Sequence, residues 1–257
     1  MTGETHPPRS ILITGASSGI GEELALGYAR EGVDLAVSGR HAGRLADVAA
    51  ACRDKGADVV SETIDVIDRA AMAGWINRVD ERRPIDLVIA NAGISGGTAG
   101  DGEDDEQVRD IFAVNLAGVL NTVLPVLPAM KARGAGQIAV VSSIAGFRGL
   151  SSAPAYSASK AAVKAWGEAI RPMLAEDGIS VSVVCPSFVT TRMTDVNKFP
   201  MPFIMPAEKA AAIIRRGLDR RKPLIVFPWQ AALAARILAN LPAWIMDPLL
   251  RRMPRKG

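Results

Sequence analysis

Short runs of apolar and β-branched residues alternate with longer segments of helical periodicity, and this alternation constrains the fold more than any other feature. The predicted strands are residues 10–14, 34–38, 58–64, 86–90, 137–142, 180–185 and 224–227. The predicted helices are residues 19–31, 42–55, 69–81, 104–133, 153–177 and 207–220. Strands separated by helices imply right-handed crossovers. We therefore predict an α/β fold, with a single doubly wound parallel sheet and helices on both faces.

The chain has 257 residues, enough for one large α/β domain and few for two. Residues 1–227 contain every predicted strand and are expected to form that domain. Residues 228–257 form an apolar and basic C-terminal extension with a predicted helix at 229–241. Its prolines, with Arg236 and Asp247, argue against a membrane span. We expect the extension to pack on the domain, a partner subunit or a membrane surface.

Several residue types are scarce, and this excludes whole classes of chemistry. His6 and His41 are the only histidines, which argues against a metal site or a histidine-based catalytic triad. Cys52 and Cys185 are far apart in sequence and have no metal-ligand spacing. With a polar start instead of an apolar leader, they predict a reduced, cytoplasmic environment.

The net charge of +3 is unevenly distributed along the chain. From residue 206 onward there are 11 lysines and arginines against three acidic residues. One interpretation is contact with an anionic surface, such as the inner face of a membrane, and the other is an ordinary charged helical surface. The region has no aromatic stacking positions interleaved with its basic residues and no nucleic-acid-binding module, so we expect no nucleic-acid partner.

A glycine-rich turn, TGASSGIG at residues 14–21, joins the first predicted strand to the first helix. Gly15 allows the tight turn, Gly19 lets the backbone approach a pyrophosphate, and Gly21 lets the helix pack closely. The free N–H groups at the start of the helix then face phosphate. The residues predicted to bind the phosphates are Gly15, Ser17, Ser18, Gly19, Ile20 and Gly21.

Four further motifs follow in order: NAG at residues 91–93, Asn115, SS at 142–143 and YSASK at 156–160. With the glycine-rich turn, they resemble the short-chain dehydrogenase/reductase family over about residues 11–193. The resemblance implies an oxidoreductase that interconverts a carbonyl and an alcohol with a nicotinamide cofactor. Beyond the turn, the cofactor-binding residues that it implies are Asp65, Asn91, Ala92, Gly93, Tyr156, Lys160, Pro186, Val189 and Thr191.

Tyr156 and Lys160 are four residues apart in a predicted helix and therefore share one face. A nearby ammonium group lowers the pKa of a phenol, so Lys160 is expected to prepare Tyr156 as the general acid/base. Ser143 can polarise the substrate carbonyl. By resemblance, Asn115 holds a water in a proton relay and Lys160 also binds the nicotinamide ribose. Each residue alone has a structural alternative: a surface pair, a turn cap or a buried amide.

The end of the second predicted strand bears on cofactor choice. NAD enzymes of this architecture place an acidic residue where this chain has Gly39, and Arg40 follows it. A guanidinium binds phosphate well, so NADP(H) is preferred, with NAD(H) as the alternative. Many NADP-binding relatives have a basic residue inside the turn, where this chain has serines. A second departure is Ser187, where relatives have glycine, and we expect backbone strain or a shifted turn there.

The segments at residues 94–106, 146–154 and 192–205 are expected to surround the substrate. The last contains Met193, Phe199, Met201 and Phe203, which favours an apolar small-molecule ketone or 3-oxo lipid. The resemblance also implies a homodimer or homotetramer, paired through residues 104–133 and 153–177. Two alternatives remain: an NAD-dependent alcohol dehydrogenase, and a nucleotide sensor without catalytic activity.

Overall fold

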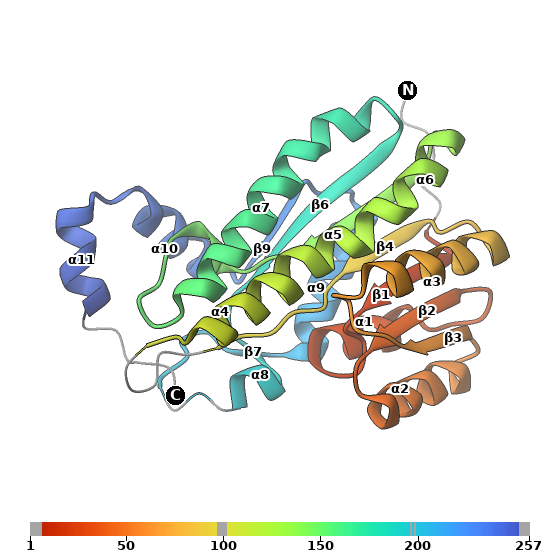
Figure 1. Cartoon of the computed structure of the whole chain (residues 1–257), viewed down its shortest axis with the longest axis horizontal. Coiled ribbons are helices and arrows are strands. Elements are labelled where there is room, and N and C mark those ends of the chain that lie inside the picture. The colour runs from red at the N-terminus through yellow and green to blue at the C-terminus, as the bar shows by residue number, and fades with distance from the viewer. Residues whose placement is uncertain (1–6, 97–101, 196, 198, 252–257) are drawn as a thin grey trace.

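The computed structural model describes residues 7–96, 102–195, 197 and 199–251. Its main sheet has seven parallel strands in the order β3-β2-β1-β4-β5-β6-β9 (Figure 1). Their bounds are β1 (Ser10–Thr14), β2 (Asp34–Gly39), β3 (Asp58–Thr63), β4 (Leu87–Ala90), β5 (Gly136–Val141), β6 (Ile179–Pro186) and β9 (Leu224–Phe227). All seven predicted strands are confirmed, with ends displaced by no more than one residue.

Helices cover both faces of the sheet, as predicted (Figure 1). One face packs against α1 (Gly19–Tyr28), α2 (Ala42–Asp54) and α9 (Ala207–Asp219). The other packs against α3 (Arg69–Arg82), α7 (Pro154–Ala175) and the long helical segment between β4 and β5. Successive residues of β1 alternate between the two cores: Ile11 and Ile13 face the first layer and Leu12 faces the second. This burial on both faces explains why the strands read as nearly continuous apolar runs.

The long segment predicted as one helix at residues 104–133 is continuous, but its hydrogen-bond register changes twice. It consists of α4 (Asp105–Phe112), a π-helical turn η1 (Ala113–Ala117), α5 (Gly118–Val123), a 3₁₀ turn η2 (Leu124–Val126) and α6 (Leu127–Arg133). By length and composition it could cross a membrane. In this structure Val119, Val123 and Met130 are buried in the core on the sheet, as in the core helix of a globular fold.

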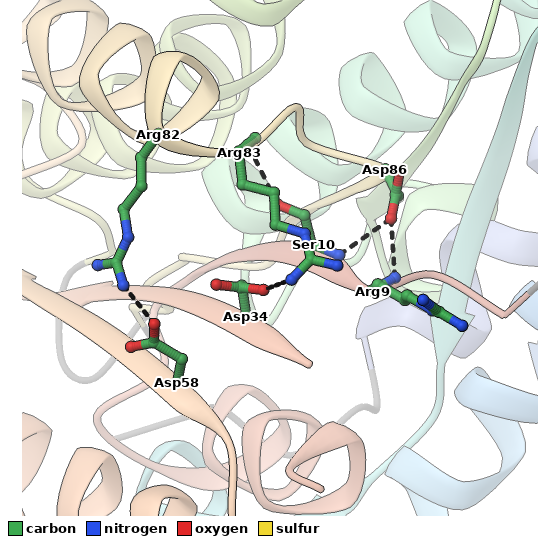
Figure 2. Close-up of polar contacts among 7 residues, drawn as sticks. All are labelled: Arg9, Ser10, Asp34, Asp58, Arg82, Arg83 and Asp86. Carbon is green, nitrogen blue, oxygen red and sulfur yellow. Dashed lines mark hydrogen bonds and ion pairs between the residues drawn. The ribbon is translucent and has the colours of Figure 1, made fainter. Parts of the chain in front are cut away.

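Charged side chains tie the amino ends of the strands together (Figure 2). The carboxylate of Asp86, which precedes β4, accepts hydrogen bonds from the backbone N–H groups of Arg9, at 2.8 Å, and Ser10, at 3.0 Å. At the end of α3, Arg82 pairs with Asp58 of β3, and the adjacent Arg83 pairs with Asp34 of β2. These contacts stabilise the edge of the sheet opposite the carboxyl ends of the strands.

The chain beyond β6 contributes short elements that sequence periodicity did not predict. They are the two-stranded sheet of β7 (Val189–Thr190) and β8 (Met205–Pro206), the short helix α8 (Arg192–Asp195) and the final helix α11 (Ala243–Arg251). The helix predicted at residues 229–241 is α10 (Trp229–Asn240). It packs against β9 and against the 3₁₀ turn η3 (Ile144–Phe147), which follows β5. In Figure 1, α10 and α11 lie at the left.

Candidate functional site

A cavity of about 840 Å³ lies across the carboxyl ends of the strands, where the strand order reverses between β1 and β4. In a doubly wound sheet this is the position at which nucleotides bind. The cavity runs from the turns after β1 and β2, past the loops after β4 and β5, to one face of α10. Because the cavity spans all of these segments, it can combine a cofactor site with a second compartment.

The glycine-rich turn has the geometry of a phosphate cradle. Gly15 and Gly19 have φ values of +68° and +61°, which side-chain-bearing residues rarely adopt. A Cβ atom on Gly21 would lie 2.2 Å from the carbonyl oxygen of Gly15, so only glycine allows α1 to begin this close to the turn. Ser17 and Ser18 line the cavity beside the start of α1. The turn therefore fits a dinucleotide pyrophosphate.

Asn91 fastens this turn to the end of β4. Its side-chain amide donates to the carbonyl oxygens of Thr14, at 3.0 Å, and Gly15, at 3.2 Å. In return, the Thr14 hydroxyl accepts from the backbone N–H groups of Asn91, at 3.2 Å, and Ala92, at 3.3 Å. Asn91, Ala92 and Gly93 all line the cavity. The NAG motif thus holds one wall of the cavity in register with the turn.

Basic side chains gather where the adenosine end of a dinucleotide would lie. Arg40, His41 and Arg44 line the cavity, and the guanidinium of Arg44 donates to the carbonyl oxygen of Ser17 at 3.3 Å. Sequence reasoning missed Arg44, because an arginine in the first turn of a helix carries no signal of its own. Asp65 does not line the cavity but lies 3.8 Å from the Arg40 guanidinium.

Ser143, Tyr156 and Lys160 meet in the middle of the cavity. Ser143 follows β5 and hydrogen-bonds to Tyr156. Tyr156 and Lys160 lie in the first turns of α7, which starts at Pro154 with its Ala155 N–H bound to the Glu103 carboxylate at 2.7 Å. Lys160 is almost fully buried, and its ammonium group donates to the Val141 carbonyl oxygen at 3.0 Å.

The expected electrostatic effect of Lys160 on Tyr156 is not present in this geometry. Burial raises the pKa of Tyr156 above its ordinary value, and the hydrogen bond with Ser143 opposes this only in part. The Lys160 ammonium lies 5.9 Å from the centre of the Tyr156 ring and is bound to Val141. Burial lowers the pKa of Lys160 itself to about 8. The prediction that Lys160 lowers the tyrosine pKa is therefore wrong for this state of the protein, because desolvation dominates both groups.

Asn115 occupies the π-helical turn η1, a form that frequently marks functional sites. Its side chain accepts from the Ile94 N–H at 2.8 Å and donates to the Ile94 carbonyl oxygen at 2.9 Å. It also donates to the Ser159 hydroxyl at 3.0 Å. A Cβ atom on Gly93 would lie 3.1 Å from the Asn115 side-chain oxygen and 3.2 Å from the Lys160 ammonium. Asn115 and Lys160 thus both approach Gly93, and Asn115 does not itself line the cavity.

The segment after β6 closes the cavity over this centre. Pro186, Val189 and Thr191 all line it. The expectation of strain at Ser187 is wrong, because its φ lies outside the left-handed region. Its backbone N–H donates to the Phe227 carbonyl oxygen at 2.9 Å, which ties the turn to the end of β9.

The far compartment of the cavity is mainly apolar. It is lined by Phe147, Leu150, Phe188, Met193, Phe199, Pro200, Pro202 and Phe203, and by Ala231, Ala234, Ala235 and Leu238 of α10. Sequence reasoning predicted the aromatic segment and missed α10. Of the segments predicted to surround the substrate, residues 97–101, 196 and 198 lie outside the described part of the chain. An apolar pocket beside Tyr156, Ser143 and Lys160 can hold a carbonyl compound against a proton donor.

A cavity that opens on a glycine-rich turn, at the switch point of a doubly wound sheet, defines a dinucleotide-binding α/β protein. The sequence profile described as short chain dehydrogenase matches residues 9–199. The chain belongs to the short-chain dehydrogenase family and is an oxidoreductase of that family.

Individual relatives resemble the chain over most of its length. An uncharacterized oxidoreductase from Myxococcus xanthus is 39% identical over 95% of this chain and 97% of its own. The ketoacyl reductase HetN from a Nostoc species is 30% identical, over 88% of this chain and 79% of its own. Among solved structures, a short-chain dehydrogenase from Sphingobium yanoikuyae in complex with NADPH superposes with a TM-score of 0.80, at 27% identity over 98% of both chains. These likenesses support a nicotinamide cofactor for this chain.

Proposed function

We propose that the protein is an NADPH-preferring oxidoreductase that reduces an apolar ketone or 3-oxo lipid to a secondary alcohol, or catalyses the reverse oxidation. The observation that carries the proposal is that Ser143, Tyr156 and Lys160 line one cavity together with the glycine-rich turn, with Ser143 and Lys160 buried and Tyr156 half-buried. A nucleotide sensor would not need these three groups at the junction of a phosphate cradle and an apolar pocket.

Bound NADPH supplies the hydride to the carbonyl carbon. Tyr156 donates a proton to the carbonyl oxygen, and Ser143 donates a hydrogen bond that polarises the carbonyl. A tyrosine phenol is protonated at neutral pH, as a proton donor in reduction must be, and burial, which raises the pKa of Tyr156, keeps it so. Lys160 and Asn115 both lie beside Gly93, and Asn115 holds the segment after β4 through Ile94. We assign to Lys160 the return of the proton to Tyr156.

The proposed preference for NADPH depends on the charge at the adenosine end. Arg40 and Arg44 offer two guanidinium groups to a 2′-phosphate, and Gly39 offers no carboxylate to repel it. The glycine-rich turn contains no basic residue, and Arg44 supplies the second basic group in its place. The alternative, an NAD-dependent alcohol dehydrogenase, uses the same catalytic residues and differs only at this end.

The apolar far compartment supports a hydrophobic substrate, and HetN, a relative, is called a ketoacyl reductase. We assign residues 1–227 to the catalytic domain and residues 228–257 to a C-terminal extension. Contacts of α10 with η3 and β9 favour docking of the extension on its own domain over the membrane alternative. The cytoplasmic location expected from the sequence stays a prediction.

Replacing Tyr156 by phenylalanine tests the proposal, because it removes only the phenolic proton. We expect kcat for ketone reduction to fall by at least about 100-fold, the usual contribution of a general acid. The dissociation constant for NADPH, measured by fluorescence, should stay within about twofold. The matched control is Tyr28→Phe, on α1 and outside the cavity lining. Turnover above about a tenth of wild type in Tyr156→Phe would remove Tyr156 from the proposed role.

A further inference from the structure

One face of α10 lines the cavity, although α10 belongs to the extension beyond the last strand. The lining residues Ala231, Ala234, Ala235 and Leu238 follow the spacing of a single helical face. Trp229, Leu233 and Ile237 lie outside this set and are exposed. The helix therefore presents three methyl groups and one leucine to the compartment, which leaves the compartment wide along this wall.

The other apolar groups that line the compartment are larger than those of α10. Phe147 and Leu150 follow the Ser143 segment, and Phe188, Phe199 and Phe203 come from the segment between β6 and β8. In the described part of the chain, no aspartate or glutamate lines the cavity. A slender apolar chain in contact with these rings and with the alanines would be desolvated without leaving a buried acidic group unpaired.

Arg148 holds α10 beside this compartment. Its guanidinium donates to the carbonyl oxygens of Leu238, at 3.2 Å, Ala239, at 3.3 Å, and Leu241, at 2.6 Å. These carbonyls lie at the end of α10, where the helix leaves acceptors unpaired and its dipole favours a cation. A second contact joins the Ser151 hydroxyl to the Leu250 carbonyl oxygen of α11 at 2.6 Å.

Arg148 directly follows η3, whose first turn is capped by Ser143. The wall is thus tied to the same short segment that presents Ser143 to the substrate. A displacement of α10 would change the width of the compartment while leaving the glycine-rich turn and α7 in place, because neither packs on α10 to a comparable extent.

From these contacts we infer that α10 is the specificity wall for the proposed reaction, and that its alanines admit an elongated, unbranched acyl chain. Arg148 is the positioning residue that keeps this wall in place. The inference rests on the proposed function and adds the shape of the substrate and the element that selects it.

Ala234→Phe tests the wall, because a phenyl group would fill the compartment from α10. The probes are the acetoacetyl and β-ketododecanoyl thioesters of N-acetylcysteamine. We expect kcat/KM for the long thioester to fall by at least about tenfold, mainly through KM, and that for acetoacetyl to change by less than about twofold. The matched control, Ala243→Phe, places the same group at the exposed start of α11 and should change neither. Equal effects on both thioesters, or none, would overturn the inference.

Arg148→Met tests the positioning role, with Arg148→Lys as the conservative variant. We expect a several-fold rise in KM for the long thioester with kcat for acetoacetyl unchanged, and partial recovery in the lysine variant. In the double variant Arg148→Met with Ala234→Phe, the two effects should be less than additive, because a loosened wall can move away. Strict additivity would separate Arg148 from the wall and overturn its role.

Binding without turnover keeps the inference separate from the proposed function. The dissociation constant of the β-hydroxydodecanoyl thioester is measured by calorimetry in the presence of NADPH, because an alcohol cannot accept a hydride and the complex therefore does not react. If wild type binds the thioester and Ala234→Phe weakens that binding at least about tenfold, the wall is supported even if no thioester is reduced. A failure to reduce any thioester would count against the proposed function alone. Absence of binding to wild type would overturn the inference itself.

Discussion

The ammonium group of Lys160 is buried in the centre of the site, and this burial makes the stability of the folded protein depend on pH. Its pKa in the folded protein is about 8, lowered from 10.5 by burial. The unfolded chain therefore binds more protons between these two values, and stability due to this group rises with pH across that window. Below about pH 8 both states are protonated, so the full destabilisation is present there.

Lys160→Met should therefore raise the thermal midpoint at neutral pH while removing most turnover. The difference in midpoint from wild type should shrink as the pH approaches about 10, because wild-type Lys160 loses its proton in that range. Calorimetric scans at several pH values measure this difference. The control is Lys209→Met, an exposed lysine on α9, for which the difference should not depend on pH. A Lys160→Met protein that melts below wild type at neutral pH would show that the ammonium group is stabilising.

Cofactor choice also belongs to the scale of single residues. Gly39→Asp with Arg40→Leu should lower the ratio of kcat/KM for NADPH to that for NADH at least about tenfold, or about 1.4 kcal/mol, because a carboxylate repels the 2′-phosphate. A Cβ on Gly39 would lie 3.0 Å from the Ser17 Cβ, so Ser17 must give slightly. Steady-state rates with both cofactors measure the ratio. Arg69→Leu, an exposed change at the start of α3, is the control. An unchanged ratio would refute the assignment.

The sequence could predict most residues of the site but not their environment. Motif spacing named Ser143, Tyr156 and Lys160, and they lie together in the cavity. The pKa direction of Tyr156 was wrong because burial is a property of packing, which spacing does not contain. Arg44 and the α10 alanines were missed for a related reason: which face of a short helix meets a cavity depends on where the helix docks.

At the scale of elements, the alternation of strands and helices was sufficient to predict the sheet. Hydrophobic periodicity reports burial, so it finds buried strands and amphipathic helices well. It does not report which carbonyl each N–H contacts, and the π-helical turn around Asn115 was therefore predicted as ordinary helix. The two-residue strands β7 and β8 are too short to show a period.

The charged contacts at the amino ends of the strands should contribute stability without affecting catalysis. Asp86→Ala removes the acceptor of two backbone hydrogen bonds, so we expect a loss on the order of 1 kcal/mol in the free energy of unfolding. Urea denaturation measures this loss, and kcat/KM should be unchanged. The control Asp105→Ala, in an exposed pair with Arg109, should lose less than about 0.5 kcal/mol. A large loss of activity in Asp86→Ala would show that the two edges of the sheet are coupled.

At the scale of the whole molecule, the outer surface of α7 is built from small residues. Ala158 and Ala165 are exposed, and Ala161 and Ala162 are half-buried. Such a surface allows close approach of a second helix, and in a twofold interface every contact between the two copies is made twice. This supports the homodimer or homotetramer that the family resemblance implies.

Ala165→Arg should shift the assembly toward monomer, because a twofold interface would place a long charged side chain where two helices approach closely, once from each copy. Sedimentation velocity at micromolar concentration measures the change, with wild type expected as dimer or tetramer. Ala212→Arg, an exposed alanine on α9, should leave the assembly unchanged. A monomeric wild type would contradict the prediction, as would an Ala165→Arg protein that assembles normally.

The cavity draws its two ends from separate stretches of the chain. The adenosine end is formed before β4 is complete, whereas the apolar compartment is formed largely after residue 143. Recombination between relatives at a point within the long helical segment would therefore exchange the substrate preference of the apolar compartment. It would leave the cofactor preference of the adenosine end unchanged. Lineages that use this fold can change their substrates by replacing the second half of the gene, while the first half keeps the residues at the adenosine end of the nucleotide site.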